Sequence, residues 1–175
     1  MSSDREVVER AAGRAHELMS CSGCAQAVLA ALQEEFGIGD TEAFKAASAL
    51  SGGVVCQGET CGALIGALMA LGLAVGREDI ADTPTYRGAM QHGVEVCRRF
   101  GEELQKQFGF SQTPASGLCP EIQRNIYGRA YNMADEAERL AFLAAGAHSD
   151  SGCPRVCAVA ARVAAEKLLQ CMKRR

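Results

Sequence analysis

The chain is 175 residues long and carries 18 basic and 21 acidic side chains, so its formal net charge is −3. That length is enough to bury a hydrophobic core without disulfides or metal ions, and we expect a single domain over residues 1–175. The balanced charge argues against a nucleic-acid-binding protein, because binding to phosphates depends on clustered Lys and Arg side chains.

Apolar residues recur at helical spacing through most of the chain, and the composition, with four prolines and no Trp, also favours helices. In chain order the expected helices cover about Ser3–Leu18, Cys24–Phe36, Thr41–Leu50, Gly58–Leu73, Pro84–Phe108, a short helix from Pro120, Met133–Ala145 and Pro154–Met172. Glycines mark breaks between them, as at Gly37, Gly39 and the run Ser51-Gly52-Gly53. The basic run Lys173-Arg174-Arg175 fits the last turn of the final helix, where it faces the negative end of the helix dipole.

The segment from Gly58 to Leu73 is apolar all round, which predicts burial at the centre of the molecule. Gly62 and Gly66 are four residues apart and share one face of this helix, where another backbone could approach closely. No segment shows the alternation typical of a strand. We therefore expect an all-α fold, a compact bundle of about six to seven helices around this buried, Gly- and Ala-rich central helix.

Nothing at the N-terminus resembles a signal peptide, because residues 1–10 are charged and contain no apolar segment. The longest uncharged run, Gly62 to Val75, is shorter than the roughly 20 residues that cross a bilayer, so we expect no membrane insertion. We therefore expect the chain to stay in the reducing cytoplasm. In that compartment, its nine cysteines indicate metal binding or redox chemistry rather than a disulfide framework.

Four of the nine cysteines lie at predicted helix starts, close to a glycine, and two of them precede a proline. They are Cys24, Cys61, Cys119 and Cys153. Free backbone N–H groups and the positive end of the helix dipole favour an anion at such positions, and the thiolate is the form of cysteine that binds metal. Hydrogen bonds from backbone amides to sulfur would also tune the potential of a bound cluster. We expect the four helix starts to converge and form a four-thiolate pocket.

The other cysteines allow more than one interpretation. Cys21, Cys56 and Cys157 each lie close in sequence to one of the four, at spacings that fit either a shared metal or a redox dithiol. Cys97 and Cys171 lie on apolar helix stripes, and we expect them to be packing residues. The three histidines, His16, His92 and His148, show no spacing typical of a ligand set.

Several segments together resemble a known family. They are Gly23–Val28, the pair Gly52-Gly53, Gly58–Met69, Cys119 and the pair Cys153-Pro154, and they lie within a match of roughly Met19 to Ala161. The family is that of redox-active proteins labelled by the pattern C-GCAxxG-C-C, and the resemblance assigns its four characteristic cysteines to Cys24, Cys61, Cys119 and Cys153. It implies redox activity, and a related domain occurs in split-Soret cytochromes that carry an iron–sulfur centre. Covalent c-type haem is not expected, because the sequence has no CxxCH motif.

The chain departs from this family in carrying Cys21, Cys56 and Cys157 as well. These thiols could supply extra ligands, allow a larger or second cluster, or act as resolving thiols. Glu59, two residues before Cys61, is a candidate for a supporting contact behind the ligands.

The sequence thus predicts an iron–sulfur protein, with a [4Fe–4S] or [2Fe–2S] cluster on the four helix-start cysteines, that transfers electrons to an unknown redox partner protein or senses redox state. We expect such a protein rather than a turnover enzyme. One alternative is a dithiol–disulfide oxidoreductase without metal that uses Cys21 and Cys24, or Cys56 and Cys61, although no thioredoxin-like βαβ pattern surrounds the CxxC motif. A second is a thiolate zinc-binding helical module, although single scattered ligands differ from the paired CxxC motifs of small zinc sites.

A third alternative is a partner-binding helical module whose thiols are incidental. The helix from Pro84 to Phe108 has an apolar stripe that could bind a second copy of the chain in a homodimer. The same stripe could equally cover the internal core.

Overall fold

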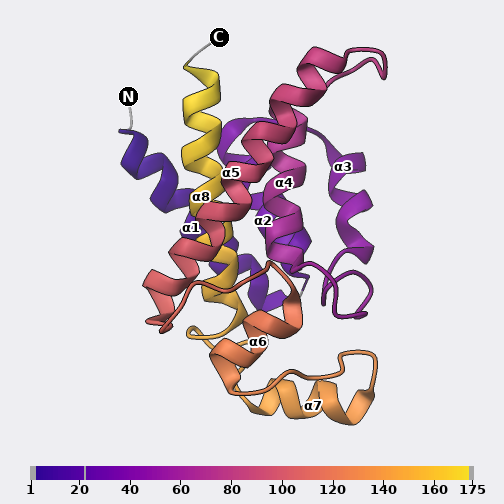
Figure 1. The fold of residues 1–175 in the computed structure, drawn as a ribbon, viewed down its shortest axis with the longest axis vertical. Coiled ribbons are helices and arrows are strands. Elements are labelled where there is room, and N and C mark those ends of the chain that lie inside the picture. Colours follow the sequence, from indigo (N-terminus) through magenta and orange to yellow (C-terminus); the bar gives the residue numbers. More distant parts are fainter. Residues whose placement is uncertain (1–2, 22, 174–175) are drawn as a thin grey trace.

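The computed structural model describes residues 3–21 and 23–173. Within these residues it contains eight α-helices and no strands, which confirms the all-α prediction (Figure 1). The helices are α1 Asp4–Leu18, α2 Cys24–Phe36, α3 Thr41–Ala46, α4 Gly62–Val75, α5 Thr83–Phe108, α6 Cys119–Tyr127, α7 Glu136–Ala144 and α8 Cys153–Met172. None of the helices in the described ranges is both long enough and apolar enough to span a membrane.

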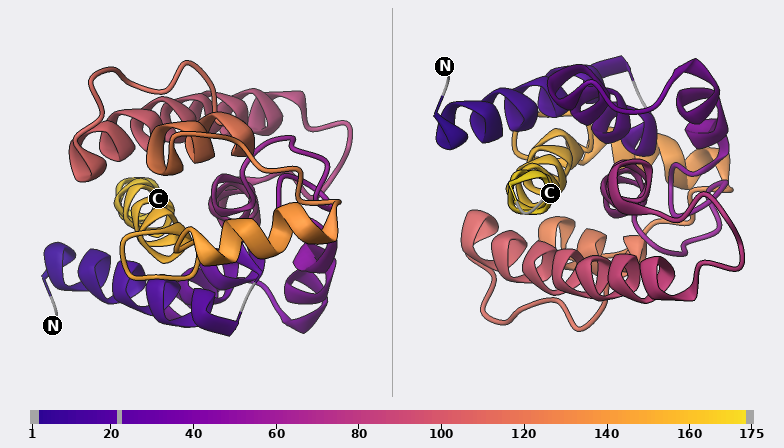
Figure 2. Two further views of the ribbon diagram at one scale, coloured as in Figure 1. Left: turned by 90° about the horizontal axis from the view of Figure 1, so that it is seen from below. Right: turned by 90° about the horizontal axis from the view of Figure 1, so that it is seen from above.

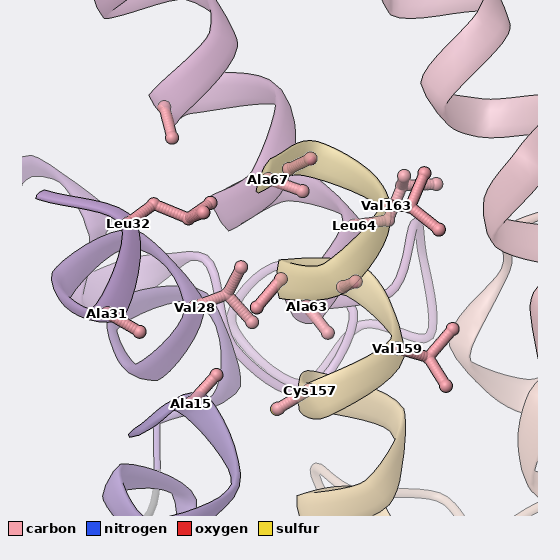
Figure 3. Packing of buried hydrophobic residues seen from close by; sticks show 14 of the residues in the cluster. Ala15, Val28, Ala31, Leu32, Ala63, Leu64, Ala67, Cys157, Val159 and Val163 are labelled. Atoms are coloured by element: carbon pink, nitrogen blue, oxygen red, sulfur yellow. The ribbon is translucent and has the colours of Figure 1, made fainter. Parts of the chain in front are cut away.

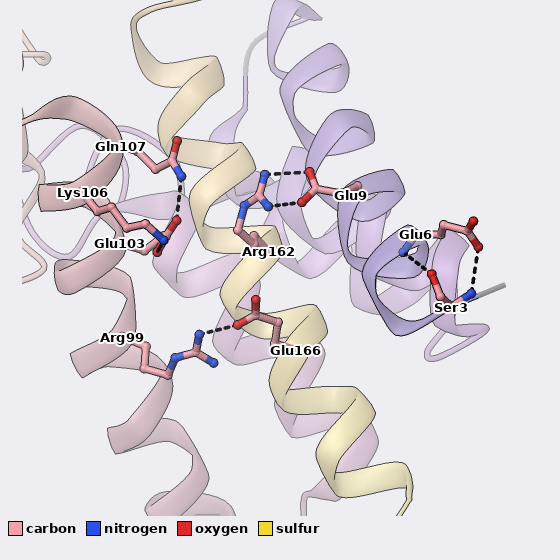
Figure 4. Close-up of polar contacts among 9 residues, drawn as sticks. All are labelled: Ser3, Glu6, Glu9, Arg99, Glu103, Lys106, Gln107, Arg162 and Glu166. Carbon is pink, nitrogen blue, oxygen red and sulfur yellow. Dashed lines mark hydrogen bonds and ion pairs between the residues drawn. The ribbon is translucent and has the colours of Figure 1, made fainter.

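Capping residues set most of the helix boundaries. The Ser3 side chain accepts from the N–H of Glu6 while the Glu6 carboxylate accepts from the N–H of Ser3, a reciprocal cap that begins α1 (Figure 4). Three other helices are preceded by an aspartate whose side chain accepts a hydrogen bond from a backbone N–H of the first turn. Asp40 caps α3, Asp82 caps α5 and Asp135 caps α7. Helices α2, α5 and α6 end at glycines in the left-handed region, at Gly37, Gly109 and Gly128.

Three predicted boundaries were wrong by several residues. Helix α4 begins at Gly62 rather than Gly58, because Thr60 lies in an extended segment that pairs with Leu118. The helix expected to reach Leu50 ends at Ala46 and continues only as a 3₁₀ turn, Ala47–Ala49. Helix α7 begins at Glu136 rather than Met133, because Asp135 caps it.

The main bundle has three layers (Figure 2). Helices α1 and α2 form one outer layer, α4 and α8 the middle layer, and α5 the other outer layer. Helix α8 contacts α1, α2, α4 and α5, and α4 contacts α2, α5 and α8. The Gly- and Ala-rich helix α4 therefore lies in the middle of the bundle, as predicted, and it shares that position with α8.

Small side chains let the middle helices approach their neighbours closely. The core consists largely of alanine, valine and leucine from α2, α4 and α8 (Figure 3). A Cβ atom placed on Gly66 would lie 2.3 Å from the carbonyl oxygen of Ala25, so α4 and α2 touch backbone to backbone at this point. The prediction of a close approach on the Gly62–Gly66 face is confirmed.

Ion pairs join the outer layers to α8. Arg162 of α8 pairs with Glu9 of α1, and Glu166, one turn later, pairs with Arg99 of α5 (Figure 4). Lys173, which follows α8, pairs with Asp4 at the start of α1, whereas Arg174 and Arg175 lie outside the described residues. The two ends of the described chain are thus held side by side.

Helices α6 and α7 lie at the other end of the bundle, away from the termini (Figure 1). This region has a small core of its own, made of Tyr131, Phe142 and Ala147 with Tyr127 and Met133 packed against it. Tyr127 makes edge contacts with both of the other rings, at centroid distances of 6.3 Å to Tyr131 and 5.2 Å to Phe142. The region therefore has an apolar cluster of its own, while Ile122 and Ile126 of α6 pack into the main core.

The structure also shows the exposure of the α5 stripe and of the two cysteines expected to be packing residues. The N-terminal half of α5 is exposed at Tyr86, Met90 and Val94, and only Val96, Phe100 and Leu104 of this helix are buried. Cys171 is buried, as predicted for a packing residue. The same prediction was wrong for Cys97, which is exposed because it lies on the outer side of α5, whereas its neighbours Val96 and Phe100 are buried.

Candidate functional site

Six thiols line one cavity of about 410 Å³ between the bundle and the α6–α7 region. The six are Cys24, Cys56, Cys61, Cys119, Cys153 and Cys157. Among them are all four cysteines from the predicted helix starts, so the structure brings these four together. Cavities of this size are typical of small-ligand and cofactor sites.

Helix starts position the four thiols. Cys24, Cys119 and Cys153 are the first residues of α2, α6 and α8, and Cys61 directly precedes α4 as its cap. Pro120 and Pro154 follow two of them in the first helical turn, where a proline costs no hydrogen bond. The positive ends of four helix dipoles therefore meet at one cavity.

A short bridge joins the starts of α4 and α6. The N–H of Cys61 donates to the carbonyl oxygen of Gly117 at 2.8 Å, and the N–H of Cys119 donates to that of Glu59 at 2.9 Å. This pairing, with Thr60 opposite Leu118, is a single antiparallel bridge. It brings Cys61 and Cys119 close together on the diagonal of the bridge, although 57 residues separate them in the sequence. Glu59 contributes its backbone, while the residue itself is exposed and is not among those lining the cavity.

Glycines make room for sulfur across the cavity. A Cβ atom on Gly62 would lie 2.4 Å from the sulfur of Cys24, and one on Gly52 would lie 2.8 Å from the sulfur of Cys56. The glycine beside Cys61 in sequence therefore accommodates the thiol of another helix. Any larger residue at Gly62 would displace the Cys24 side chain.

Cys56 reaches the cavity through a turn of unusual backbone geometry. Five consecutive residues, Gly52 to Cys56, have positive φ, with values of 56° at Val54, 45° at Val55 and 64° at Cys56. Left-handed geometry costs an L-residue roughly 1–2 kcal/mol, so three non-glycine residues in succession constitute real strain. Four backbone hydrogen bonds hold the turn. Three of 2.9 Å run from the N–H groups of Val55, Gln57 and Glu59 to the carbonyl oxygens of Ala49, Val54 and Gly53, and one of 3.3 Å runs from Cys56 N–H to that of Ser51. Strained backbone of this kind is concentrated at functional sites.

Burial raises the pKa values of these thiols. It raises the pKa of Cys119 and of Cys153 to about 12, with a further rise from neighbouring thiolates. The pKa values of Cys61 and Cys157 lie well above the ordinary range for the same two reasons. The prediction that a helix start favours the thiolate is therefore wrong for Cys61, Cys119 and Cys153, because desolvation and mutual repulsion outweigh the dipole. Without a cation in the cavity these thiols are neutral at pH 7.

Polar groups lie beside three of the four helix-start sulfurs and partly oppose this rise. Backbone amides of Ala63 and Leu64 lower the pKa of Cys61. The Nε2 of Gln123 donates to the Cys119 sulfur at 3.5 Å, and the Tyr127 hydroxyl lies 3.8 Å from the Cys153 sulfur. Gln123 is itself buried and is held by the N–H of Tyr131, which donates to its Oε1 at 2.8 Å.

The structure also identifies residues at the site that sequence reasoning missed. Gln123, Tyr127 and Ser51 belong to no sequence motif. For Ser51 the one signal in the sequence is its place in the Ser-Gly-Gly break, whereas Gln123 and Tyr127 are found only from their position close to a cysteine in the fold. The Oγ of Ser51 is buried in the cavity wall and has no hydrogen-bond partner among the described residues. The far wall is mainly apolar, formed by Met133, Leu140, Phe142 and Leu143, with Arg139 and His148 beside them.

The three additional cysteines differ in position. Cys56 faces the cavity from the left-handed turn, and its charge raises the pKa of Cys119. Cys157 also lines the cavity, but it is fully buried and belongs to the hydrophobic core (Figure 3). Cys21 is exposed and lines a different groove, between α2 and α3, and Ser22 beside it lies outside the described residues. Cys21 therefore lines the groove between α2 and α3, whereas Cys24 lines the six-thiol cavity.

The donor set is one that a metal cluster could use. Thiolates favour iron–sulfur clusters and zinc, and an apolar wall would keep water from either. The buried hydroxyl of Ser51, which has no partner among the described residues, also fits a group bound to sulfur in this cavity. In the part of the chain that the structure describes, no three His, Cys, Asp or Glu side chains are grouped as ligands of one metal ion. For a single metal ion the ligands must lie very close together: two thiolates on one tetrahedral zinc ion would be roughly 3.8 Å apart, given Zn–S bonds of about 2.3 Å.

Comparison with known proteins identifies the family. Residues 22–167 match the family model described as "Putative redox-active protein (C_GCAxxG_C_C)". A search of curated proteins and of solved structures finds no significant match to this chain. The family match covers most of the 175 residues and includes all six thiols of the cavity. The chain therefore belongs to the C_GCAxxG_C_C family, whose members are described as redox-active.

Proposed function

We propose that this protein binds an iron–sulfur cluster through Cys24, Cys61, Cys119 and Cys153 and uses it for electron transfer or redox sensing. The observation that supports this proposal best is the meeting of these four thiols, from four different helix starts, at one cavity. When bound, the cluster would supply one-electron chemistry. Zinc has no redox chemistry, so the redox description of the family favours iron over zinc.

The residues around the sulfurs would then hold and tune the bound group. The backbone amides at Cys61, Gln123 at Cys119 and Tyr127 at Cys153 are donors whose hydrogen bonds strengthen when the thiols become thiolates. Met133, Phe142 and their neighbours keep the far wall apolar. These contacts orient the ligands and limit the access of water, which is how a protein sets the potential of such a centre.

The raised thiol pKa values also favour metal binding over dithiol chemistry. A nucleophilic cysteine needs an appreciable thiolate fraction near neutral pH. Cys119 and Cys153, with pKa values of about 12, have almost none. A bound metal cation removes the proton outright, so the same burial that disfavours thiol exchange is compatible with ligation.

Of the additional cysteines, we assign Cys56 as the thiol that can supplement the four ligands and Cys157 as a packing residue. Cys56 is half-buried, lies close to Cys119 and is carried by the left-handed turn Gly52–Cys56. Cys157 is enclosed by the core, and its sulfur lies 3.9 Å from the carbonyl oxygen of Cys24. Cys21 has no place in this site.

The first test is reconstitution with iron and sulfide without oxygen, followed by iron and sulfide analysis and a visible absorption spectrum. We expect stoichiometric iron and sulfide, lost when Cys24, Cys61, Cys119 or Cys153 is replaced by alanine. Cys97→Ala is the matched control, because Cys97 is exposed on α5 and does not line the cavity.

Two other outcomes would contradict the proposal. A protein that stays colourless and binds zinc but not iron would be a zinc-binding module. A protein that binds neither metal but forms a disulfide within the cavity on mild oxidation would be a dithiol oxidoreductase.

A further inference from the structure

Ser51 carries a buried hydroxyl whose hydrogen-bonding capacity is unused. Its Oγ is inaccessible to solvent and has no partner among the described residues. A buried hydroxyl without a partner is costly and is rare in folded proteins, so such an atom calls for an explanation. The hydroxyl belongs to a residue that lines the six-thiol cavity.

The surroundings of Gly62 show which sulfur Ser51 faces. A Cβ atom on Gly62 would lie 2.4 Å from the sulfur of Cys24 and 3.2 Å from the Cα of Ser51. The Cys24 sulfur and Ser51 therefore flank the same glycine. A Cβ atom on Gly23, the residue before Cys24, would lie 4.0 Å from the Oγ of Ser51. Ser51 therefore lies close to Cys24, while its Oγ makes no hydrogen bond to a described residue in this structure.

The donors at the other three helix-start thiols set Cys24 apart. Cys61 has backbone amides, Cys119 has Gln123 and Cys153 has Tyr127. Among the described residues, no side chain donates a hydrogen bond to the sulfur of Cys24, in contrast to Cys119 and Cys153. A thiol without a side-chain donor and a hydroxyl without a partner lie close together in the same wall.

We propose that Ser51 donates a hydrogen bond to the Cys24 thiolate when the metal centre is bound, and that it raises the reduction potential of this centre. The inference rests on the proposed function, because a neutral thiol is a weak acceptor and only ligation makes Cys24 a strong one. A hydrogen bond to a ligand sulfur stabilises the more negative, reduced state of a cluster over the oxidised state. Ser51 is a positioning residue in this role, since it acts through Cys24.

The test is Ser51→Ala, compared with the unmodified protein after anaerobic reconstitution with iron and sulfide. We expect the same iron and sulfide content but a more negative midpoint potential. At a fixed solution potential, the ratio of reduced to oxidised centre should fall about tenfold in the variant. This change corresponds to a shift of about 59 mV in the midpoint potential of a one-electron couple. The variant should also lose one exchangeable-proton coupling in electron–nuclear double resonance spectra recorded in H₂O and D₂O.

Ser48→Ala is the matched control. Ser48 belongs to the same connection between α3 and α4, but its hydroxyl accepts from Gln26 and does not line the cavity. This variant should leave the potential and the proton coupling unchanged.

Thermal unfolding of the metal-free protein supplies a second readout. Ser51→Ala removes a hydroxyl without a partner, so it should leave the melting temperature of the metal-free protein unchanged or raise it. A purely structural serine would instead stabilise both the free and the loaded protein, and a clear loss of stability without metal would overturn the inference.

The failures of the two proposals are distinguishable. A protein that takes up no iron overturns the proposed function and the role of Ser51 with it. A protein that holds a full cluster with the same potential and the same proton coupling in Ser51→Ala overturns only the role of Ser51.

Discussion

At the scale of single residues, burial decides the chemistry of the thiols. A helix start alone would lower the pKa of cysteine, as the sequence suggests for Cys61, Cys119 and Cys153. The cavity removes water from these sulfurs and brings further thiols within reach, and both effects act in the opposite direction. The site is therefore poised to hold neutral thiols when free and thiolates only when a cation accompanies them.

This difference predicts how the stability of the metal-free protein depends on pH. An unfolded cysteine titrates near pH 9.0, whereas folded Cys119 and Cys153 titrate near 12. Above pH 9 the unfolded state therefore loses protons that the folded state keeps, and the free energy of unfolding falls as pH rises towards 12. Each such thiol contributes a slope of at most about 1.4 kcal/mol per pH unit.

Urea unfolding at pH 8 and pH 10 under reducing conditions measures this effect. The double variant Cys119→Ala/Cys153→Ala should lose about 1–3 kcal/mol less than the unmodified protein between these two pH values. The comparison cancels lysines and tyrosines, which titrate in both proteins. Equal losses in the two proteins would show that neither thiol has a raised pKa.

At the scale of the helix, the glycines of α4 serve different purposes. Gly66 lies where the backbones of α4 and α2 touch, and Gly62 lies against the sulfur of Cys24. Gly72, ten residues beyond Gly62 in the same helix, faces open space, and a Cβ atom there would meet no neighbouring atom within 4 Å. Helix propensity alone assigns all three glycines the same destabilising effect. Their effects differ only because they contact different neighbours in the fold.

The pair Gly66→Ala and Gly72→Ala tests this distinction. A methyl group at Gly66 would lie 2.3 Å from the carbonyl oxygen of Ala25, so the helices must separate, and we expect a loss of about 1–3 kcal/mol in the free energy of unfolding. At Gly72 the gain in helix propensity is unopposed, and we expect a gain of up to about 1 kcal/mol. Chemical denaturation measures both, and a neutral Gly66→Ala would refute the close contact between α2 and α4.

At the scale of the whole molecule, the site joins two parts of unequal packing. Helices α1, α2, α4, α5 and α8 share one extensive core, which Ile122 of α6 also joins, whereas α7 packs into the small cluster of Tyr131, Phe142 and Ala147. The four proposed ligands come from both parts, because Cys119 begins α6 and the other three begin helices of the bundle. Metal binding would therefore tie the α6–α7 region to the bundle.

Hydrogen exchange measured by mass spectrometry can detect this coupling. Reconstitution with iron and sulfide should slow exchange about tenfold or more in residues 50–61 and 117–153, because ligand binding energy adds to the stability of the segments that carry the ligands. The start of α1 and the end of α8, which Asp4 and Lys173 join away from the cavity, serve as the internal reference. Equal exchange in residues 117–153 before and after iron uptake would contradict a ligand role for Cys119.

The exposed stripe of α5 also belongs to this scale. Tyr86, Met90 and Val94 face away from the core, at 44%, 52% and 66% exposure, so this half of the stripe does not cover the interior. The interpretation as a homodimer seam stays a prediction.

Much of the fold could be predicted because helices are local structures. Apolar spacing, aspartate caps and terminal glycines act within a few residues, so the eight helices lie where the sequence indicates them, with errors at Gly58, Leu50 and Met133. The boundary at Gly58 failed because Thr60 pairs with Leu118, a partner that no local pattern reveals.

The sequence by itself determined the all-α class, the family, and the four cysteines at helix starts, since each of these depends on short-range patterns. Only the tertiary structure decided that these thiols share a cavity, that Cys56 joins them while Cys21 does not, and that Gly62 makes room for Cys24. It also decided the direction of the thiol pKa values and the positions of Ser51, Gln123 and Tyr127. The physical reason is the same throughout: burial, repulsion between thiols and hydrogen bonding to sulfur are set by residues that lie far apart in the chain and meet only when it folds.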